Sequence, residues 1–195
     1  MFRWLSYLAF AFSLAGLAKA DADARLYFPR GALDLSSAES DNFDNNWYSS
    51  HLRAMAEPVL APSGTTHTYR FTWLRTFHHP VAIRVVATHG QFKLFATELD
   101  GAGGYSPGAV LRKKSVSLSA AQFKELEEVI LRNDFWHLPP HEDTMGLDGS
   151  EWIVEAATDK YHAVVRWTPR GGAIHEIGER LLSLAGWTFD SREMY

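Results

Sequence analysis

Three side chains able to cooperate in proton transfer or anion binding lie in one stretch, Leu147–Trp167. They are Glu155, His162 and Arg166, which supply a carboxylate, an imidazole and a guanidinium. A carboxylate and an imidazole within hydrogen-bond reach can act as general acid and base, and a guanidinium binds anionic groups. The chemistry therefore depends on whether the fold brings the three together.

The same stretch has the pattern of a β-hairpin around Asp159-Lys160. If these two residues form the turn, Trp152 lies opposite Trp167 on an apolar face that should be buried. Glu155 is then diagonal to both the imidazole and the guanidinium on the other face, within reach of long side chains. An Asp-Lys turn lacks the Gly that two-residue hairpins prefer, and a slip of one residue would separate the three polar groups.

This polar cluster has three interpretations. It could be a solvated cross-strand ion pair of small stabilising value. It could bind an anionic or polar ligand through its charged groups. It could also be the acid–base site of a small hydrolase-like enzyme.

A glycine-rich segment, Asp100–Gly108, holds a second motif. Residues 104–108, GYSPG, match the G-x-S-x-G pattern of serine hydrolases, which works only where a strand turns sharply into a helix. Here the preceding DGAGG is loop and the following AVLRKKSV is strand, so the sequence predicts a hairpin connection. Tyr105 in this connection is a candidate for ligand binding, together with the polar cluster of the hairpin.

Histidines near the predicted turns are the candidates for metal binding. His78, His79 and His89 flank one predicted strand, and imidazole binds zinc and copper ions. Their convergence at one end of the sheet would form a surface for such ions, with help from His67, His137 and His141. No fixed ligand spacing accompanies them, so we expect no dedicated metal centre and no cofactor.

The elements that must position these residues follow from the apolar pattern. Alternation predicts four strands over 68–77, 81–88, 91–99 and 109–118, joined by the short links of an antiparallel meander. A helix over 119–133 begins with a capping box formed by Ser119 and Gln122. The hairpin follows, and a last helix covers 172–185.

These elements predict an α+β fold in a single domain. The order ββββ-α-ββ-α indicates an antiparallel sheet of six strands with helices packed on one face, preceded by an N-terminal helix over 43–57. We expect residues 21–42 to be a flexible lead-in, residues 43–187 to form the domain, and residues 188–195 to be a C-terminal tail.

The N-terminus has the pattern of a secretory signal peptide over residues 1–20. Arg3 precedes the uncharged apolar run Leu5–Leu17, and Ala18-Lys19-Ala20 fits the small-x-small cleavage rule. The run is shorter than the roughly 20 residues of a membrane span. The sequence therefore predicts cleavage near Ala20, a secreted or periplasmic protein, and no stable membrane insertion.

Charge and composition narrow the function further. Removing residues 1–20 takes away Arg3 and Lys19 and no acid, so the formal net charge of −4 becomes −6. This balance argues against nucleic acid as a partner. The chain has no cysteine, so thiolate chemistry and Cys-ligated zinc are excluded. Aromatic residues make up 13% of the chain, and any rings that the core leaves exposed would mark a binding face.

Three segments carry a more specific pattern: ELDGAGGYSPG, NDFWHLP and LDGSEWIVEAATDKYHAVVRWTP. Together they resemble a family of secreted bacterial proteins whose activity is uncharacterised, with the pattern D-G-x-G-G-Y-x-P-G, F-W-x-L-P, and D-G-x-x-W-x-x-E followed by Y-H and R-W-x-P. The likeness covers about residues 68–186. It implies a shared fold and no particular activity.

We therefore expect a non-enzymatic binding or interaction module. Its partner would be an envelope or extracellular protein or a small polar ligand. The alternative is a small hydrolase-like enzyme that uses Glu155, His162 and Arg166. A cavity enclosing all three side chains would favour the enzyme, and a flat surface would favour the binding module.

Overall fold

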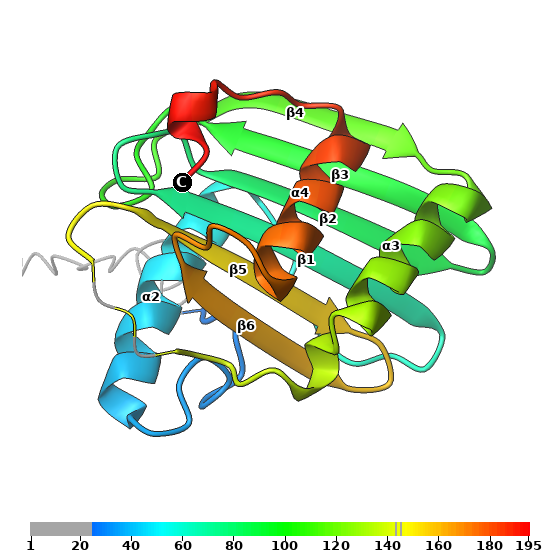
Figure 1. Ribbon diagram of the computed structural model, residues 1–195, viewed down its shortest axis with the longest axis horizontal. Helices are drawn as coiled ribbons and strands as arrows, with labels where there is room; N and C mark the ends of the chain where they lie inside the picture. Colours follow the sequence, from blue (N-terminus) through cyan, green and yellow to red (C-terminus); the bar gives the residue numbers. More distant parts are fainter. Residues whose placement is uncertain (1–24, 143, 145) are drawn as a thin grey trace, which may run out of the picture.

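The computed structural model describes residues 25–142, 144 and 146–195 (Figure 1). The expected signal peptide and its cleavage site near Ala20 lie outside these residues. The elements follow in the predicted order, and they are α2 (Ala38–Ala54), β1 (Thr66–Arg75), β2 (Val81–Thr88), β3 (Gln91–Leu99), β4 (Val110–Ser117), α3 (Ala120–Arg132), β5 (Ser150–Ala157), β6 (Tyr161–Trp167) and α4 (Ala173–Ala185).

The six strands form one antiparallel sheet in the order β4-β3-β2-β1-β5-β6. Strands β1 to β4 are the predicted meander. Strand β5 pairs with the free side of β1, so the C-terminal hairpin extends the same sheet. Trp73 of β1 thereby lies between Val81 of β2 and Trp152 of β5. The predicted single-domain α+β fold is confirmed.

Helices α3 and α4 cover one face of the sheet, as predicted (Figure 1). The capping box is present, because Ser119 Oγ accepts from the Gln122 N–H while the Gln122 side chain accepts from the Ser119 N–H. Leu126 is fully buried against the sheet. Gly178 of α4 lies so close to Trp152 that a Cβ there would stand 2.6 Å from the indole ring, so a glycine is needed for this close approach.

Helix α2 covers the opposite face of the sheet (Figure 1). It begins at Ala38 after the N-cap Ser37, five residues before the predicted start at Phe43. The sheet is therefore enclosed on both faces over part of its width. Nearly all of β1 is buried on both faces, whereas the alternating pattern predicted a strand that is only half buried.

The segment before α2 is packed, although it was expected to be a flexible lead-in. Tyr27, Phe28 and Leu33 are buried against α2 and the sheet. Asp41 explains the difference, because its carboxylate accepts hydrogen bonds from the main-chain N–H groups of Gly31 and Leu33. Polar residues here tie down the main chain, so polarity alone was a poor sign of mobility.

The β5–β6 hairpin differs from the predicted register by one residue. Trp152 pairs with Arg166, and Glu151 pairs with Trp167. The two Trp side chains therefore point to opposite faces, and the predicted Trp152–Trp167 contact is wrong. The prediction assumed a single buried face, whereas Ile153 lies buried on the α2 face of β5. A register is fixed when only one face of a strand pair is apolar and must be buried. Here both faces carry apolar side chains, so burial did not decide between the two registers.

Residues 188–195 return to the face covered by α3 and α4, where Phe189 and Met194 pack against the core. The C-terminal segment is therefore attached to the domain (Figure 1). Within the described ranges, no helix is long and apolar enough to cross a membrane.

Candidate functional site

Glu155, the carboxylate of the predicted cluster, forms a buried ion pair with Arg70. Arg70 Nε donates to Glu155 Oε2 at 2.6 Å, and Arg70 Nη2 donates to Glu155 Oε1 at 2.7 Å. Both side chains are 0% exposed, on the face covered by α2. The planar guanidinium thus binds the carboxylate through two parallel hydrogen bonds.

Three more groups complete this buried network. Tyr161 Oη donates to Glu155 Oε1 at 2.9 Å, and Arg84 Nε donates to Glu57 Oε2 at 2.7 Å. Burial, the largest single effect, lowers the pKa of Arg70, but the charge and hydrogen bonds of Glu155 together with the charge of Glu57 outweigh it, and the pKa is raised. Arg70 Nη1 donates to the main-chain oxygen of Pro58 at 2.7 Å and lies 3.5 Å from Glu57 Oε2, so the buried guanidinium is paired and hydrogen-bonded, as a buried charge requires.

His162 and Arg166 lie on the other face of the hairpin. His162 Nε2 contacts the main-chain oxygen of Leu138 at 3.0 Å, and burial lowers the pKa of this imidazole. Arg166 Nε pairs with Glu142 Oε1 at 2.9 Å. The structure therefore does not bring the three predicted side chains together, because the one-residue change of register sends Glu155 to the opposite face.

The cavities agree with this separation. His162 lines a hollow of 410 Å³ together with Trp136 and Tyr161. Arg166 lines a different hollow of 330 Å³ beside Glu142. Glu155 lines neither of these hollows. The geometry expected of an acid–base enzyme at this hairpin is therefore not formed.

The candidate metal ligands are also apart. His78 and His79 lie in the β1–β2 turn, whereas His89 lies in the β2–β3 turn at the other end of β2. Within the described part of the chain, no three His, Cys, Asp or Glu residues are arranged to hold a metal ion. The convergence that the sequence suggested is wrong, since consecutive turns of a meander lie at opposite ends of the sheet.

Tyr105 lies in the β3–β4 loop, as predicted, and is 67% exposed. Its ring lies 6.2 Å from that of Phe77, which is 57% exposed. The loop is fixed to the β1–β2 turn by main chain: Gly103 N donates to His78 O and Gly104 N donates to Thr76 O. This loop therefore presents an exposed pair of rings on a firmly held support.

A second ring pair adjoins the same loop from α2. Trp47 Nε1 donates to the main-chain oxygen of Gly103 at 2.9 Å. The ring of Phe43, 69% exposed, lies 6.5 Å from the Trp47 ring. We call Phe43, Trp47, Phe77 and Tyr105 the aromatic surface.

Sequence reasoning found only Tyr105 of the aromatic surface. Phe77 was expected on the apolar side of a strand, but β1 ends at Arg75. Phe43 lies outside the buried stripe of α2 that Tyr48 and Leu52 form. Its position relative to that stripe was a signal in the sequence that its ring is exposed.

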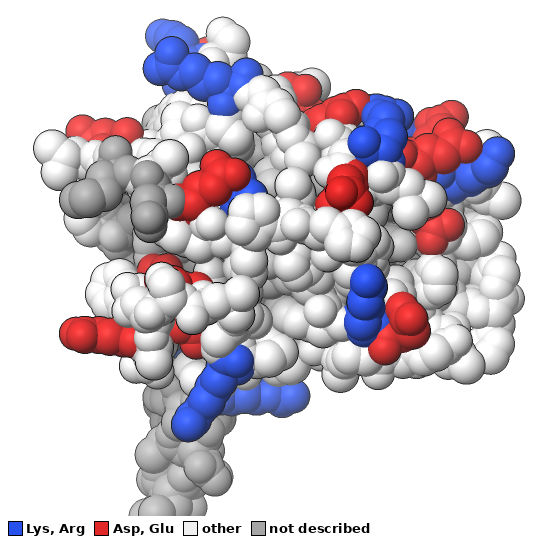
Figure 2. Space-filling model, turned by 60° about the horizontal axis from the view of Figure 1, so that its bottom comes forward, with Lys and Arg blue, Asp and Glu red and all other residues white. Residues whose placement is uncertain are grey.

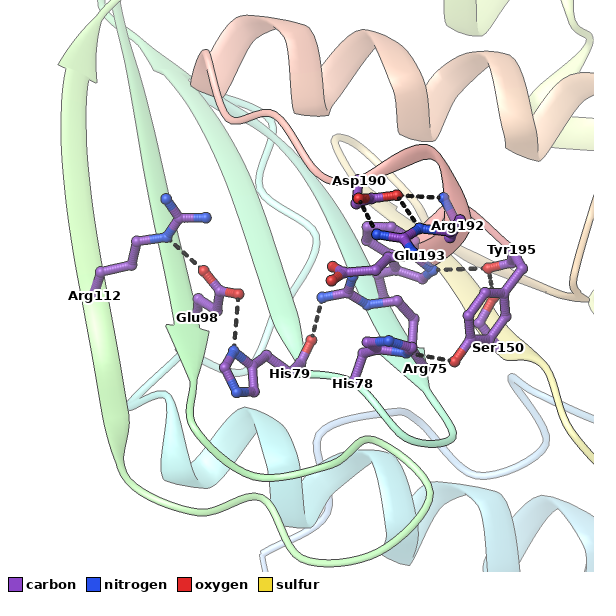
Figure 3. Close-up of polar contacts among 11 residues, drawn as sticks. Arg75, His78, His79, Glu98, Arg112, Ser150, Asp190, Arg192, Glu193 and Tyr195 are labelled. Carbon is purple, nitrogen blue, oxygen red and sulfur yellow. Dashed lines mark hydrogen bonds and ion pairs between the residues drawn. The ribbon is translucent and has the colours of Figure 1, made fainter.

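A further assembly lies where the C-terminal segment meets β1 and β5 (Figure 3). A main-chain oxygen of Tyr195 accepts from Trp73 Nε1 at 3.2 Å, from Trp152 Nε1 at 3.1 Å, and from Ser150 Oγ. Each of the three donor residues is at most 1% exposed. Together with Arg75, we call these residues the tail site: Trp73, Arg75, Ser150 and Trp152.

Arg75 supplies the charge of the tail site. Its side chain is 1% exposed, and its Nη1 donates to Glu193 Oε2 at 3.0 Å. The guanidinium carbon lies 4.1 Å from the centre of the Trp73 ring and 4.8 Å from that of Phe189. Burial lowers the pKa of Arg75, and the charge of Glu193 opposes that change.

The neighbouring histidines extend this polar region (Figure 3). His78 Nδ1 lies 2.7 Å from Tyr195 Oη. His79 Nδ1 lies 3.3 Å from Glu98, which also accepts from Arg112 at 2.5 Å. One feature of the sequence pointed to the tail site. Arg75 is two residues after Trp73 in the same strand, so its charged side chain lies on the same, core-facing side of the sheet.

No protein-family model matches this chain, and no curated protein is significantly similar to it. The fold and the two assemblies define a small α+β protein with an exposed aromatic surface and a buried cationic site. Its function is inferred from that geometry.

Proposed function

We propose that this protein is a secreted or periplasmic, non-enzymatic binding module that engages an envelope or extracellular protein through the aromatic surface. The aromatic surface is the single observation that carries the proposal. Three of its four rings are more than half exposed, at 69%, 57% and 67% for Phe43, Phe77 and Tyr105.

Exposed rings of this size suit a contact with another macromolecule. Aromatic side chains are enriched at the centre of protein interfaces, where truncating one often costs 2 kcal/mol or more of binding free energy, as an order of magnitude. Hydrogen bonds hold the main chain of the loop that carries Tyr105 against the β1–β2 turn that carries Phe77, and they hold the Trp47 ring against the same loop. A held surface loses little conformational entropy on binding, which favours affinity.

The charge distribution favours a protein over a nucleic acid as the partner. On the face shown in Figure 2, Lys and Arg are interspersed with Asp and Glu, and wide areas carry neither. Nucleic acid binding requires a basic stripe or patch. The formal net charge of −4 for the whole chain points the same way.

The proposed secretion rests on the sequence of residues 1–20. Its first check is the intact mass of protein recovered from the periplasm or the medium. A mass that corresponds to cleavage near Ala20 is expected, and a mass retaining the first 20 residues would contradict the proposed secretion.

The recovered protein then serves as bait for envelope extract. We expect one or a few proteins to be retained, and their recovery should fall by ~10-fold or more when Phe77→Ala and Tyr105→Ala are combined. The matched control is Leu131→Ala, because Leu131 is 67% exposed on α3, away from the β3–β4 loop. Equal recovery by the double variant and the control, or no retained protein at all, would refute the proposal.

A further inference from the structure

We propose that the tail site is a binding site for a short, carboxylate-bearing peptide, and that residues 189–195 of this chain, which include one helical turn at Ser191–Glu193, are its resident occupant. This inference uses none of the aromatic surface, so it stands or falls separately from the proposed function. It would give the protein a second site, with a defined class of ligand.

Buried hydrogen-bond donors converge in the tail site. Trp73 and Ser150 donate to one oxygen of Tyr195, and the single N–H of Trp152 is shared between this oxygen at 3.1 Å and Ser150 Oγ at 2.9 Å. Buried donors that converge on one oxygen favour a strong acceptor, and a carboxylate is a stronger acceptor than an amide carbonyl. Buried donors aimed at one point form a preorganised anion site.

Arg75 places a buried positive charge in the tail site. A guanidinium stays protonated in proteins, so its burial requires an anionic partner. Among the described residues, the ion pair of Arg75 is with Glu193 of the C-terminal segment. Arg75 Nε is also buried with no hydrogen-bond partner. The strands thus supply the cation, and the segment supplies the carboxylate.

Residues 189–195 are attached to the domain without joining its sheet. Their main-chain N–H bonds to main-chain oxygens stay within the segment, from Glu193 N to Asp190 O and from Met194 N to Ser191 O. None of these residues is part of a strand of the sheet. The segment is held by Phe189, Glu193 and Tyr195, as a bound peptide is held by its anchors.

The test uses the full-length protein, which is labelled and then cleaved at a single position. The chain has no cysteine, so Ser191→Cys gives a single position for a fluorescent label, on an exposed residue. A protease site inserted at the exposed Thr188 then separates residues 189–195 from the domain. Fluorescence anisotropy after cleavage reports whether the labelled segment stays bound.

We expect the anisotropy to remain high after cleavage and to fall when unlabelled peptide of residues 189–195 is added in excess. A competitor carrying Glu193→Gln should need a concentration ~10-fold or more higher, because it lacks the carboxylate for Arg75. The matched control is a competitor with Arg192→Ala. The Arg192 side chain is 88% exposed and pairs with Asp190 of the same segment, so this competitor should act like the parent peptide.

Three outcomes would overturn the inference. The anisotropy could fall to the free-peptide value on cleavage and stay there. The labelled segment could resist every concentration of competitor, which would make it a fixed part of the core. The Glu193→Gln competitor could also act as strongly as the parent peptide, which would remove Arg75 from recognition.

Discussion

The ion pair of Arg70 and Glu155 is costly to disturb because both of its charges are buried. Both side chains are 0% exposed and joined by two hydrogen bonds. Removing one member of a buried pair leaves the other charge without compensation. We expect Arg70→Met to lower the free energy of unfolding by about 3–5 kcal/mol, measured by urea denaturation.

A double variant separates loss of the pair from loss of packing. Arg70→Met combined with Glu155→Leu should be less destabilised than Arg70→Met alone, because no buried charge is then left unpaired. The surface control is Arg132→Met, which breaks a pair with Glu176 whose side chains are 56% and 43% exposed. This control should cost no more than about 1 kcal/mol. A double variant that is less stable than Arg70→Met alone would contradict the account.

Glu151 gives the protein a defined pH dependence. Burial, followed by the nearby charge of Asp44, raises the pKa of Glu151 to about 8, and burial raises the pKa of Asp44 to about 6. A raised carboxyl pKa means that the folded state holds a proton that the unfolded state releases. The contribution of Glu151 is therefore neutral below its unfolded pKa near 4.5 and becomes increasingly destabilising until pH 8.

We expect Glu151→Gln to flatten this dependence. The variant and the parent should differ little near pH 4, and the variant should gain relative stability toward pH 8 by at most about 1.4 kcal/mol per pH unit. The control is Glu128→Gln, whose side chain is 55% exposed. Unfolding in urea at several pH values measures the difference. A constant offset between Glu151→Gln and the parent at all pH values would rule out the raised pKa.

Among the helices and strands, those whose formation depends on neighbouring residues in the sequence were predicted correctly. The four strands of the meander, the capping box at Ser119 and the helix α3 all follow from patterns within one segment. Helix α2 begins earlier than predicted, at Ala38, where the N-cap Ser37 accepts from the Ser40 N–H, and the buried Asp41 in its first turn binds main chain. Tertiary contacts gave these polar residues a role that composition does not reveal.

The hairpin shows why the candidate site could not be predicted. The sequence placed Glu155, His162 and Arg166 on one face of the hairpin only for one register. That register assumed that one face is buried and the other is exposed to solvent. The face covered by α2 is also buried, as Ile153 and Val165 show. The position of a distant helix thus decided which polar side chains meet.

At the scale of the molecule, both assemblies lie at the same end of the sheet. The β1–β2 turn joins them, because Phe77 belongs to the aromatic surface while His78 contacts Tyr195. The β3–β4 loop and the start of β5 also lie there (Figure 1). Turns and a chain end converge at this end of the sheet, and such segments often carry binding residues.

The two edges of the sheet are protected in different ways, and this difference yields a prediction for the whole molecule. Edge β6 is partly covered, since Val165 N donates to the main-chain oxygen of Pro140 at 2.7 Å. Edge β4 is exposed and relies on positive charge, with Lys113 in the middle of the strand. Lysine on an edge strand opposes pairing with a second chain.

Replacing that charge should therefore permit self-association through β4. We expect Lys113→Ile to form concentration-dependent oligomers in sedimentation velocity, because an apolar β-branched residue favours strand pairing at a free edge. The matched control is Lys124→Ile on α3, where the side chain is 78% exposed but the helix has already paired its own main chain. This control adds the same apolar surface and should sediment like the parent. If both variants associate equally, surface hydrophobicity rather than the β4 edge is the cause.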